Sequence, residues 1–294
     1  MQLSKRRCAV TRIRETFLLL VALVLASASA FAQGTYTQIN VPGASQTRCL
    51  GIDSVGDVVG YSSTTGGSIN GFLLSEGIYT TINYHGLDTT LWGINDKGQI
   101  VGQSGGSFVY NLNTQIFFGI KYPGTDEPTY AYSINNAGVV SGDFFYHGDS
   151  KGFELSGSTY SVVSPPGGIN TYALGITGSG KIVGYADTHA RGFINFWYLG
   201  GTYQELPVPN APDAFVAGIN PAGSALVGVY QPSPGEYAGF IYQDKTLQTL
   251  LFPGAAQTVP IGVNDAGEVV GYIYDTSDNT HGFTWTPPAA ASKK

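Results

Sequence analysis

Short apolar runs alternate with polar turns along nearly all of the chain after residue 33. The clearest example is Gly93-Ile94-Asn95-Asp96-Lys97-Gly98-Gln99-Ile100-Val101-Gly102, in which two apolar segments flank an Asn-x-x-Gly core. The pattern occurs six times at intervals of 40 to 44 residues, because related segments begin at Gly51, Ser133, Gly175, Gly218 and Gly262. A period of this length is typical of a repeat protein in which each copy forms one small structural unit.

The Asn-x-x-Gly core predicts a tight hairpin turn between two strands. Glycine enters the left-handed backbone region without steric cost, and an asparagine side chain can bond the backbone two residues further on. In one copy Pro221 follows Asn220 and presets the dihedral angle that a type I turn requires. A cation-binding or catalytic Asn-Asp pair is the alternative, but the polar positions vary among the copies while the glycine stays.

Two further strand patterns accompany each hairpin. One is Gly-Phe followed by apolar residues, as in Gly71-Phe72 and Gly192-Phe193, and the other is a strand that ends near Pro-Gly. Four short strands in about 42 residues are typical of a propeller blade, and one such unit alone cannot bury enough apolar surface to be stable. We therefore predict an all-β fold, a six-bladed β-propeller with four strands per blade. A solenoid is the runner-up.

The first 32 residues have the composition of an export signal. A basic start precedes the apolar run Phe17 to Leu25, and Ala30-Phe31-Ala32 fits the small-x-small cleavage rule. That run is shorter than the roughly 20 residues that span a bilayer, and no later stretch approaches this length. We assign 1–32 to a signal peptide, 33–288 to the propeller and 289–294 to a disordered tail. We expect a secreted, extracellular protein with no membrane span after signal removal; the periplasm is an alternative.

Charge and cysteine content narrow the possible partners. Without residues 1–32 the chain has 9 basic and 19 acidic residues, a net charge of −10, which argues against nucleic acid and anionic membranes. Cys49 then remains alone, so no intramolecular disulfide is expected. Other copies have leucine or alanine at the Cys49 position, which indicates a buried apolar site rather than a reactive thiol.

The combination of Gly-Ile-Asn-Asp-x-Gly-x-Ile-Val-Gly, His281-Gly282-Phe283 and strands ending in Pro-Gly-Ala resembles the extracellular HAF-repeat family of bacteria. That family is named for a His-Ala-Phe tripeptide. Here glycine replaces the alanine, and other copies replace the histidine by Asn70, Lys151, Arg191 or Ala238. The resemblance covers nearly all of the chain after residue 32. It implies secretion and repeat architecture, and it implies no reaction.

The segments between the second and third strands of each unit vary most in length and chemistry. Variable loops on a rigid scaffold commonly carry recognition, and aromatic rings beside polar groups can stack on sugars or bind peptides. We therefore predict a binding module for a glycan or an extracellular protein, although these side chains could instead be solvated loop residues. The candidate ligand-binding residues are Tyr146, His147, His189, Arg191, Tyr237, Tyr274 and His281.

No catalytic motif is evident in the sequence. It has no His-Glu-x-x-His and no cysteine-pair metal site. The three loop histidines could converge toward the axis. Asp143 with Asp149 and Asp275 with Asp278 form acidic clusters, but the second lacks the spacing of a calcium loop. We expect a monomer with no catalytic residues, metal or cofactor. A hydrolase or lyase at the channel mouth and a purely structural surface protein are the alternatives.

The last unit ends at Trp285 without a fourth strand, whereas the chain after residue 33 begins with a spare one. We predict that this N-terminal strand completes the last blade. Deletion of residues 34–44 should then lower the thermal unfolding midpoint, because the last blade would lose its outer strand. Circular dichroism melting measures the midpoint, and deletion of 289–294 serves as the control. A 34–44 deletion as stable as the parent would contradict closure by this strand.

Overall fold

The computed structural model describes residues 34–189, 192–211 and 213–289. Residues Tyr36–Thr284 form one compact unit, and the described residues 34–35 and 285–289 belong to a second. Within the second unit Gly34 lies against Trp285, where a Cβ atom would be 2.6 Å from the indole ring. The predicted signal peptide, Arg191 and residues 290–294 of the predicted tail lie outside the described residues.

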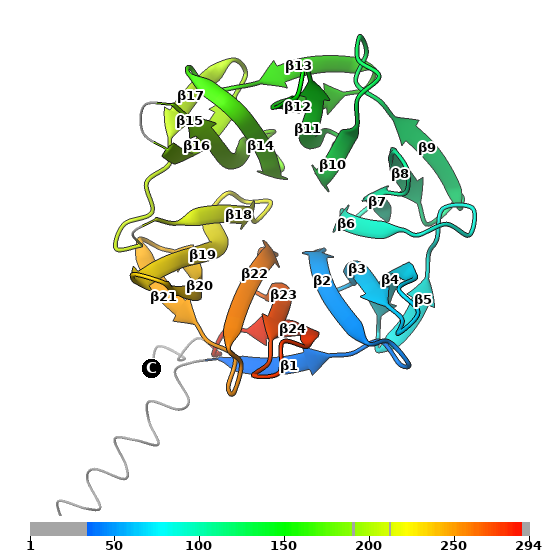
Figure 1. Ribbon diagram of the computed structural model, residues 1–294, viewed down its shortest axis with the longest axis vertical. Coiled ribbons are helices and arrows are strands. Elements are labelled where there is room, and N and C mark those ends of the chain that lie inside the picture. The colour runs from blue at the N-terminus through cyan, green and yellow to red at the C-terminus, as the bar shows by residue number, and fades with distance from the viewer. Residues whose placement is uncertain (1–33, 190–191, 212, 290–294) are drawn as a thin grey trace, which may run out of the picture. The chain divides into compact units, whose positions relative to one another are not determined.

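The described strands form six antiparallel sheets of four strands, arranged as the blades of a ring (Figure 1). Blades 1 to 5 are, in chain order, β2–β5 (Gln46–Ile52, Val58–Ser63, Ile69–Ser75, Ile78–Thr81), β6–β9 (Thr90–Ile94, Gln99–Gln103, Ser107–Asn111, Ile116–Ile120), β10–β13 (Thr129–Ile134, Val140–Tyr146, Asp149–Ser156, Thr159–Val163), β14–β17 (Gly168–Ile176, Ile182–Thr188, Gly192–Leu199, Thr202–Glu205) and β18–β21 (Phe215–Ile219, Ala225–Ser233, Glu236–Gln243, Thr246–Leu250). Blade 6 has the order β1-β24-β23-β22, with bounds Thr35–Ile39, Thr280–Thr286, Val269–Tyr274 and Gln257–Val263. The predicted six-bladed propeller and its closure by the N-terminal strand are confirmed.

The Asn-x-x-Gly segments form the predicted turns. In blade 2 the Gly98 N–H donates to the Asn95 carbonyl at 3.0 Å, and Gly98 has a φ of +68°. The Asn95 Oδ1 accepts hydrogen bonds from the N–H groups of Lys97 at 3.1 Å and Gln99 at 3.0 Å. Turn geometry therefore accounts for both the asparagine oxygen and the glycine.

The asparagine amide nitrogen has a second role, which connects neighbouring blades. Asn95 Nδ2 donates to the Asn135 carbonyl at 2.8 Å, and Asn135 Nδ2 donates to the Thr177 carbonyl at 3.0 Å. Asn264 Nδ2 likewise donates to the Asp53 carbonyl at 3.1 Å. Each carbonyl also accepts the N–H of its own turn glycine, so loss of the amide donor would remove one of two hydrogen bonds at that oxygen and cost about 0.5–1.5 kcal/mol.

Between blades 5 and 6 the amide of Asn220 donates to a side-chain oxygen, Asp265 Oδ1, at 2.8 Å. The other two interfaces have no asparagine amide bond, because their turns begin with Asp53 and Thr177. At the interface of blades 1 and 2 the Ser54 N–H donates to Asp96 Oδ1 at 2.9 Å instead, and this bond is exposed. At the interface of blades 4 and 5 the Gly178 N–H donates to the Pro221 carbonyl at 2.8 Å. We call these two interfaces the seams. They divide the ring into blades 2–4 and blades 5, 6 and 1.

Each innermost strand contains a β-bulge that the sequence pattern did not predict. The register shifts by one residue at the same place in all six copies, at Leu50, Trp92, Tyr132, Leu174, Ala217 and Ile261. The glycine after the bulge lets neighbouring inner strands touch: a Cβ on Gly93 would lie 2.8 Å from the Tyr132 carbonyl oxygen. A Cβ on Gly102, opposite the bulge, would lie 2.7 Å from the Thr90 carbonyl oxygen. Close backbone approach therefore explains both outer glycines of the motif.

The phenylalanine of the Gly-Phe pattern is buried in every blade, but the prediction for blade 4 was wrong. Gly184 pairs with Phe196, as Gly60 pairs with Phe72, so Phe196 is the equivalent residue. Phe196 is 1% exposed, whereas Phe193 is 58% exposed and packs on Tyr185. The error arose because Asn195 replaces the glycine before the buried phenylalanine, while another Gly-Phe pair, Gly192-Phe193, lies three residues earlier. The apolar reading of Cys49 is confirmed, since its side chain is fully buried and burial raises its thiol pKa.

The substitution Asp53→Asn should stabilise the protein, because an amide there can donate to the Asn95 carbonyl across the seam. We expect a gain of about 1 kcal/mol and a rise in Tm of about 2 °C. Burial raises the pKa of Asp53, so its ionisation opposes folding as the pH rises, and the gain should be larger at pH 7 than at pH 4.

The reciprocal substitution Asn135→Asp removes a buried donor and should cost about 0.5–1.5 kcal/mol. The exposed Asn113→Asp is the control for the chemical change itself. Urea unfolding at both pH values measures all three variants. An Asp53→Asn protein no more stable than the parent at pH 7 would contradict the role of the amide.

Candidate functional site

The hairpins between the second and third strands of the blades define what we call the loop face. The predicted loop from Asp143 to Lys151 is shorter than expected, because β11 and β12 continue to a two-residue turn. Tyr146 pairs with Asp149, and His147 and Gly148 between them both have positive φ, at +53° and +85°. The Tyr146 and His147 rings pack at 4.2 Å, and Tyr146 is 45% exposed. Two left-handed residues are typical of a type I′ hairpin turn.

His281 connects the two ends of the ring. Its Nδ1 lies 2.8 Å from Asn40 Oδ1 and its Nε2 lies 3.4 Å from Asp275 Oδ2. In blade 1 the equivalent pair is Asn70 and Asn83, whose side chains bond at 2.7 Å. The histidine of His-Gly-Phe therefore binds the asparagine that follows the outermost strand.

The carboxylate of Asp275 accepts hydrogen bonds from residues of its own turn. Its Oδ1 accepts the N–H groups of Ser277 at 2.8 Å and Asn279 at 2.9 Å, and its Oδ2 accepts Asn279 Nδ2 at 2.9 Å. The hydrogen bonds from Asn279, above all, lower the pKa of Asp275 to about 2. Asp149 lies 3.3 Å from Lys151 Nζ, whereas Asp143 is buried elsewhere. Within the described ranges no three His, Cys, Asp or Glu side chains are grouped so as to hold a metal ion.

Tyr237 and Tyr274 line one open groove of about 1030 Å³ on the loop face, which we call the blade 5–6 groove. Tyr237 is 46% exposed, and Tyr274 is half-buried. Arg48 Nη2 donates to the Tyr274 hydroxyl at 3.1 Å, and its guanidinium carbon lies 4.3 Å from the centre of the Tyr272 ring. The other groove residues are Tyr230, Pro232, Gly235, Glu236, Ala238, Thr249, Leu251, Ala256, Gln257 and Asp278.

The seven predicted ligand-binding residues thus occupy separate places. Tyr237 and Tyr274 share the blade 5–6 groove, and Tyr146 and His147 pack on each other in blade 3. His189 is exposed in the turn after β15, and Arg191 lies outside the described residues. His281 lies beside Asp275. A ligand-binding role for all seven stays a prediction.

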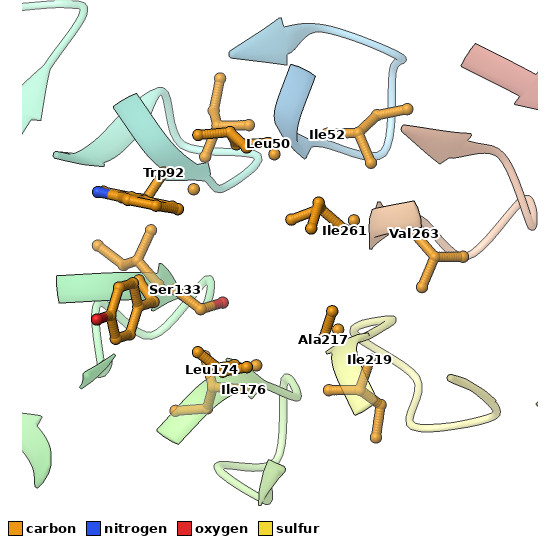
Figure 2. A pocket seen from close by; sticks show the side chains of 18 of the residues that line it. Leu50, Ile52, Trp92, Ser133, Leu174, Ile176, Ala217, Ile219, Ile261 and Val263 are labelled. Atoms are coloured by element: carbon orange, nitrogen blue, oxygen red, sulfur yellow. The ribbon is translucent and has the colours of Figure 1, made fainter. Parts of the chain in front are cut away.

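A second hollow lies on the axis, where the innermost strands meet (Figure 2). This axial pocket has a volume of about 320 Å³ and is lined by the bulge residues and the pairs that follow them, which are Gly-Ile or Gly-Val except for Ser133-Ile134 in blade 3. Most of its wall is aliphatic, including Leu50, Leu174, Ala217 and Ile261. None of the seven predicted residues lines it.

One side of the axial pocket is aromatic. Trp92 and Tyr132 are bulge residues of blades 2 and 3, and their rings are 5.3 Å apart at 87°. Tyr172 and Tyr185 of blade 4 also line the pocket, with ring centres 4.8 Å apart. Figure 2 shows Trp92 across the pocket from Ala217. We call these four rings the aromatic wall.

Asp143 is buried behind the aromatic wall. Its Oδ2 accepts a hydrogen bond from Ser150 Oγ at 2.6 Å, and its Oδ1 is buried without a hydrogen-bond partner. Burial raises the pKa of Asp143 to about 6, against the opposing effects of the Ser150 and Tyr132 hydroxyls. The sequence contained one signal for this site: the equivalent residue in other copies is a tyrosine, glutamine or valine, never an acid. From the sequence we instead assigned Asp143 to an acidic loop cluster with Asp149.

A scan against protein-family models found no match, and neither did a search of curated proteins. Solved structures share the fold at low sequence identity. A gluconolactonase from Xanthomonas campestris matches with a TM-score of 0.55 and 11% identity, over 88% of this chain and 93% of that one. TolB from Acinetobacter baumannii matches with a TM-score of 0.51 and 13% identity over 74% of this chain, which spans 60% of the TolB chain.

The β-propeller domain of the Trilobed protease from Pyrococcus furiosus, whose description reports an open velcro topology, matches with a TM-score of 0.51 and 11% identity. The match covers 83% of this chain and 82% of that one. In this chain β1 and β24 pair, so its ring is closed. The described residues contain no helix that is long and apolar enough to cross a membrane. The comparisons show the propeller fold, which enzymes and other proteins share.

The substitution Asp143→Asn should raise stability at neutral pH. Because the folded-state pKa is raised from 3.8 to about 6, ionisation opposes folding, and stability is lost as the pH rises through that interval. The gain over the parent should be about 2–3 kcal/mol at pH 8 and small at pH 4. Urea unfolding across this range measures it, with the half-exposed Asp149→Asn as control. A pH-independent difference would show that Asp143 titrates normally.

Proposed function

We propose that this protein is exported and acts as a binding module, with the blade 5–6 groove of the loop face as a site for a glycan. The observation that carries the proposal is the pair Tyr237 and Tyr274, which neighbouring blades contribute to one open groove. Export rests on the composition of residues 1–32. The propeller fold supports an interaction module in general, and the groove supports the choice of ligand.

The groove is held in shape before any ligand binds. Ser233 pairs with Glu236 at the tip of the β19–β20 hairpin, and the side chain of Asp275 closes the β23–β24 turn. Within the groove lining, the hydroxyls of Tyr230 and Thr249 form a hydrogen bond of 2.7 Å. A site that needs little ordering on binding loses less conformational entropy to its ligand.

The groove chemistry suits a sugar. Tyrosine offers a flat apolar face for the C–H groups of a pyranose ring and a hydroxyl for hydrogen bonding. Glu236, Gln257 and Asp278 add acceptors for sugar hydroxyls along the same groove. The Tyr274 hydroxyl accepts a hydrogen bond from Arg48, so its own proton is free to point toward an acceptor. We propose binding without catalysis, because this lining offers no nucleophile held by a base.

A glycan array probed with residues 33–294 tests the proposal. We expect binding to specific oligosaccharides, with affinity at least tenfold lower for Tyr237→Ala, because a stacked aromatic residue contributes about 1–3 kcal/mol at such sites. Calorimetry on one positive glycan gives the size of the loss.

The matched control is Tyr146→Ala. Tyr146 is 45% exposed and Tyr237 is 46% exposed, so the two substitutions remove comparable surface, but Tyr146 lies in blade 3 away from the groove. We expect Tyr146→Ala to bind as the parent does. An array without hits would overturn the glycan assignment. Equal losses for both variants would contradict the choice of groove.

A further inference from the structure

We propose that the axial pocket is a second binding site, for a small organic ammonium ion that lies against the aromatic wall with the buried carboxylate of Asp143 as its counter-charge. The four wall rings belong to Trp92, Tyr132, Tyr172 and Tyr185. This site is distinct from the blade 5–6 groove, since the two share no lining residue.

The size and lining of the pocket favour an organic occupant over water. A volume of about 320 Å³ corresponds to the liquid volume of about ten water molecules. Its wall is largely aliphatic, so most of those waters would have few partners there. The volume lies at the lower end of the range for small-molecule sites, which suits a molecule of one or two rings.

The ring geometry favours a cation. Trp92 and Tyr132 meet at 87° with ring centres 5.3 Å apart, so they form two sides of a corner. Tyr172 and Tyr185 continue the wall from blade 4. Aromatic faces carry negative electrostatic potential, and several rings around one space are the usual environment for ammonium groups. In the part of the chain that the structure describes, Arg48 and Lys181 are the cations recorded over rings, and they lie over other residues.

Asp143 supplies the opposite charge. The groups packed around it are the hydroxyls of Tyr132 on β10 and Ser150 on β12, with Tyr172 on β14 and Tyr185 on β15. Burial raises the pKa values of all three tyrosines, the negative charge of Asp143 raises them further, and Asp187 adds to the pKa of Tyr172. None of the described Lys, Arg and His ion pairs involves Asp143.

A buried carboxylate without a cationic partner is unfavourable, and its Oδ1 has no hydrogen-bond partner. A tyrosine hydroxyl that donates its proton to the Asp143 carboxylate can use its own oxygen to accept a hydrogen bond from a ligand in the axial pocket. An ammonium group would bind such oxygens and offset the charge behind them. A carboxylate or phosphate ligand would meet repulsion there, in a chain whose net charge after residue 32 is −10.

Three probes of similar shape test the charge preference: phenethylammonium, neutral 2-phenylethanol and anionic 3-phenylpropionate. Titration calorimetry on residues 33–294 at pH 8 should give phenethylammonium an affinity at least tenfold higher than 2-phenylethanol, with no binding of 3-phenylpropionate. The affinity for phenethylammonium should fall about tenfold at pH 5, because Asp143 has a pKa of about 6 and becomes protonated. Absence of phenethylammonium binding, or equal binding of all three probes, would overturn the proposal.

Variants locate the site. Asp143→Asn should reduce the affinity for phenethylammonium at least tenfold at pH 8 and abolish the pH dependence, while Trp92→Leu should weaken binding at every pH. If either variant fails to fold, the comparison of the three probes and the pH profile of the parent protein still test the proposal. Tyr237→Ala should bind phenethylammonium as the parent does. The ammonium proposal therefore stands or falls independently of whether the blade 5–6 groove binds a glycan. A Tyr237→Ala protein that loses phenethylammonium binding would contradict the axial assignment.

Discussion

The contact between innermost strands of neighbouring blades is the constraint on which the rest of the structure depends. The inner strands of neighbouring blades come within touching distance, so a Cβ atom on Gly93 or Gly218 would meet a backbone oxygen of the next blade; blade 3 has Ser133 at this position. The bulge at each of these positions turns one side chain out of the regular alternation, and the buried asparagine amides bind the carbonyl of the next blade. The ten-residue motif is therefore an interface motif as much as a hairpin.

Periodic features of the fold could be predicted from the sequence, because a repeat displays its own period. Six copies of the hairpin motif indicated the number of blades, and the unmatched strand indicated the closure. The bulges were missed because the extra residue in each inner strand is apolar like its neighbours, so the pattern of residue types along the strand does not reveal it. Phe196 was missed because Asn195 replaces the glycine that precedes the buried phenylalanine in most copies, and Gly192-Phe193 resembles the pattern three residues earlier.

The candidate sites were harder to predict than the fold, because they combine residues from different copies. Trp92, Tyr132 and Tyr185 are about 40 residues apart from one another or more, and only the curvature of the ring brings them to one pocket. Tyr237 and Tyr274 meet in the same way. Function in such a repeat resides in departures from the consensus. Asp143 is an acid at a position where no other copy has one.

The two seams also have a consequence for how the ring comes apart. Blades 2–4 and blades 5, 6 and 1 are each joined by asparagine amides, and the second set includes the blade that joins both ends of the chain. The bond at the seam between blades 1 and 2 is exposed, so water competes for it directly. The apolar clusters continue across both seams, so we expect the ring to open there first by losing these hydrogen bonds and not by separating into two rigid halves.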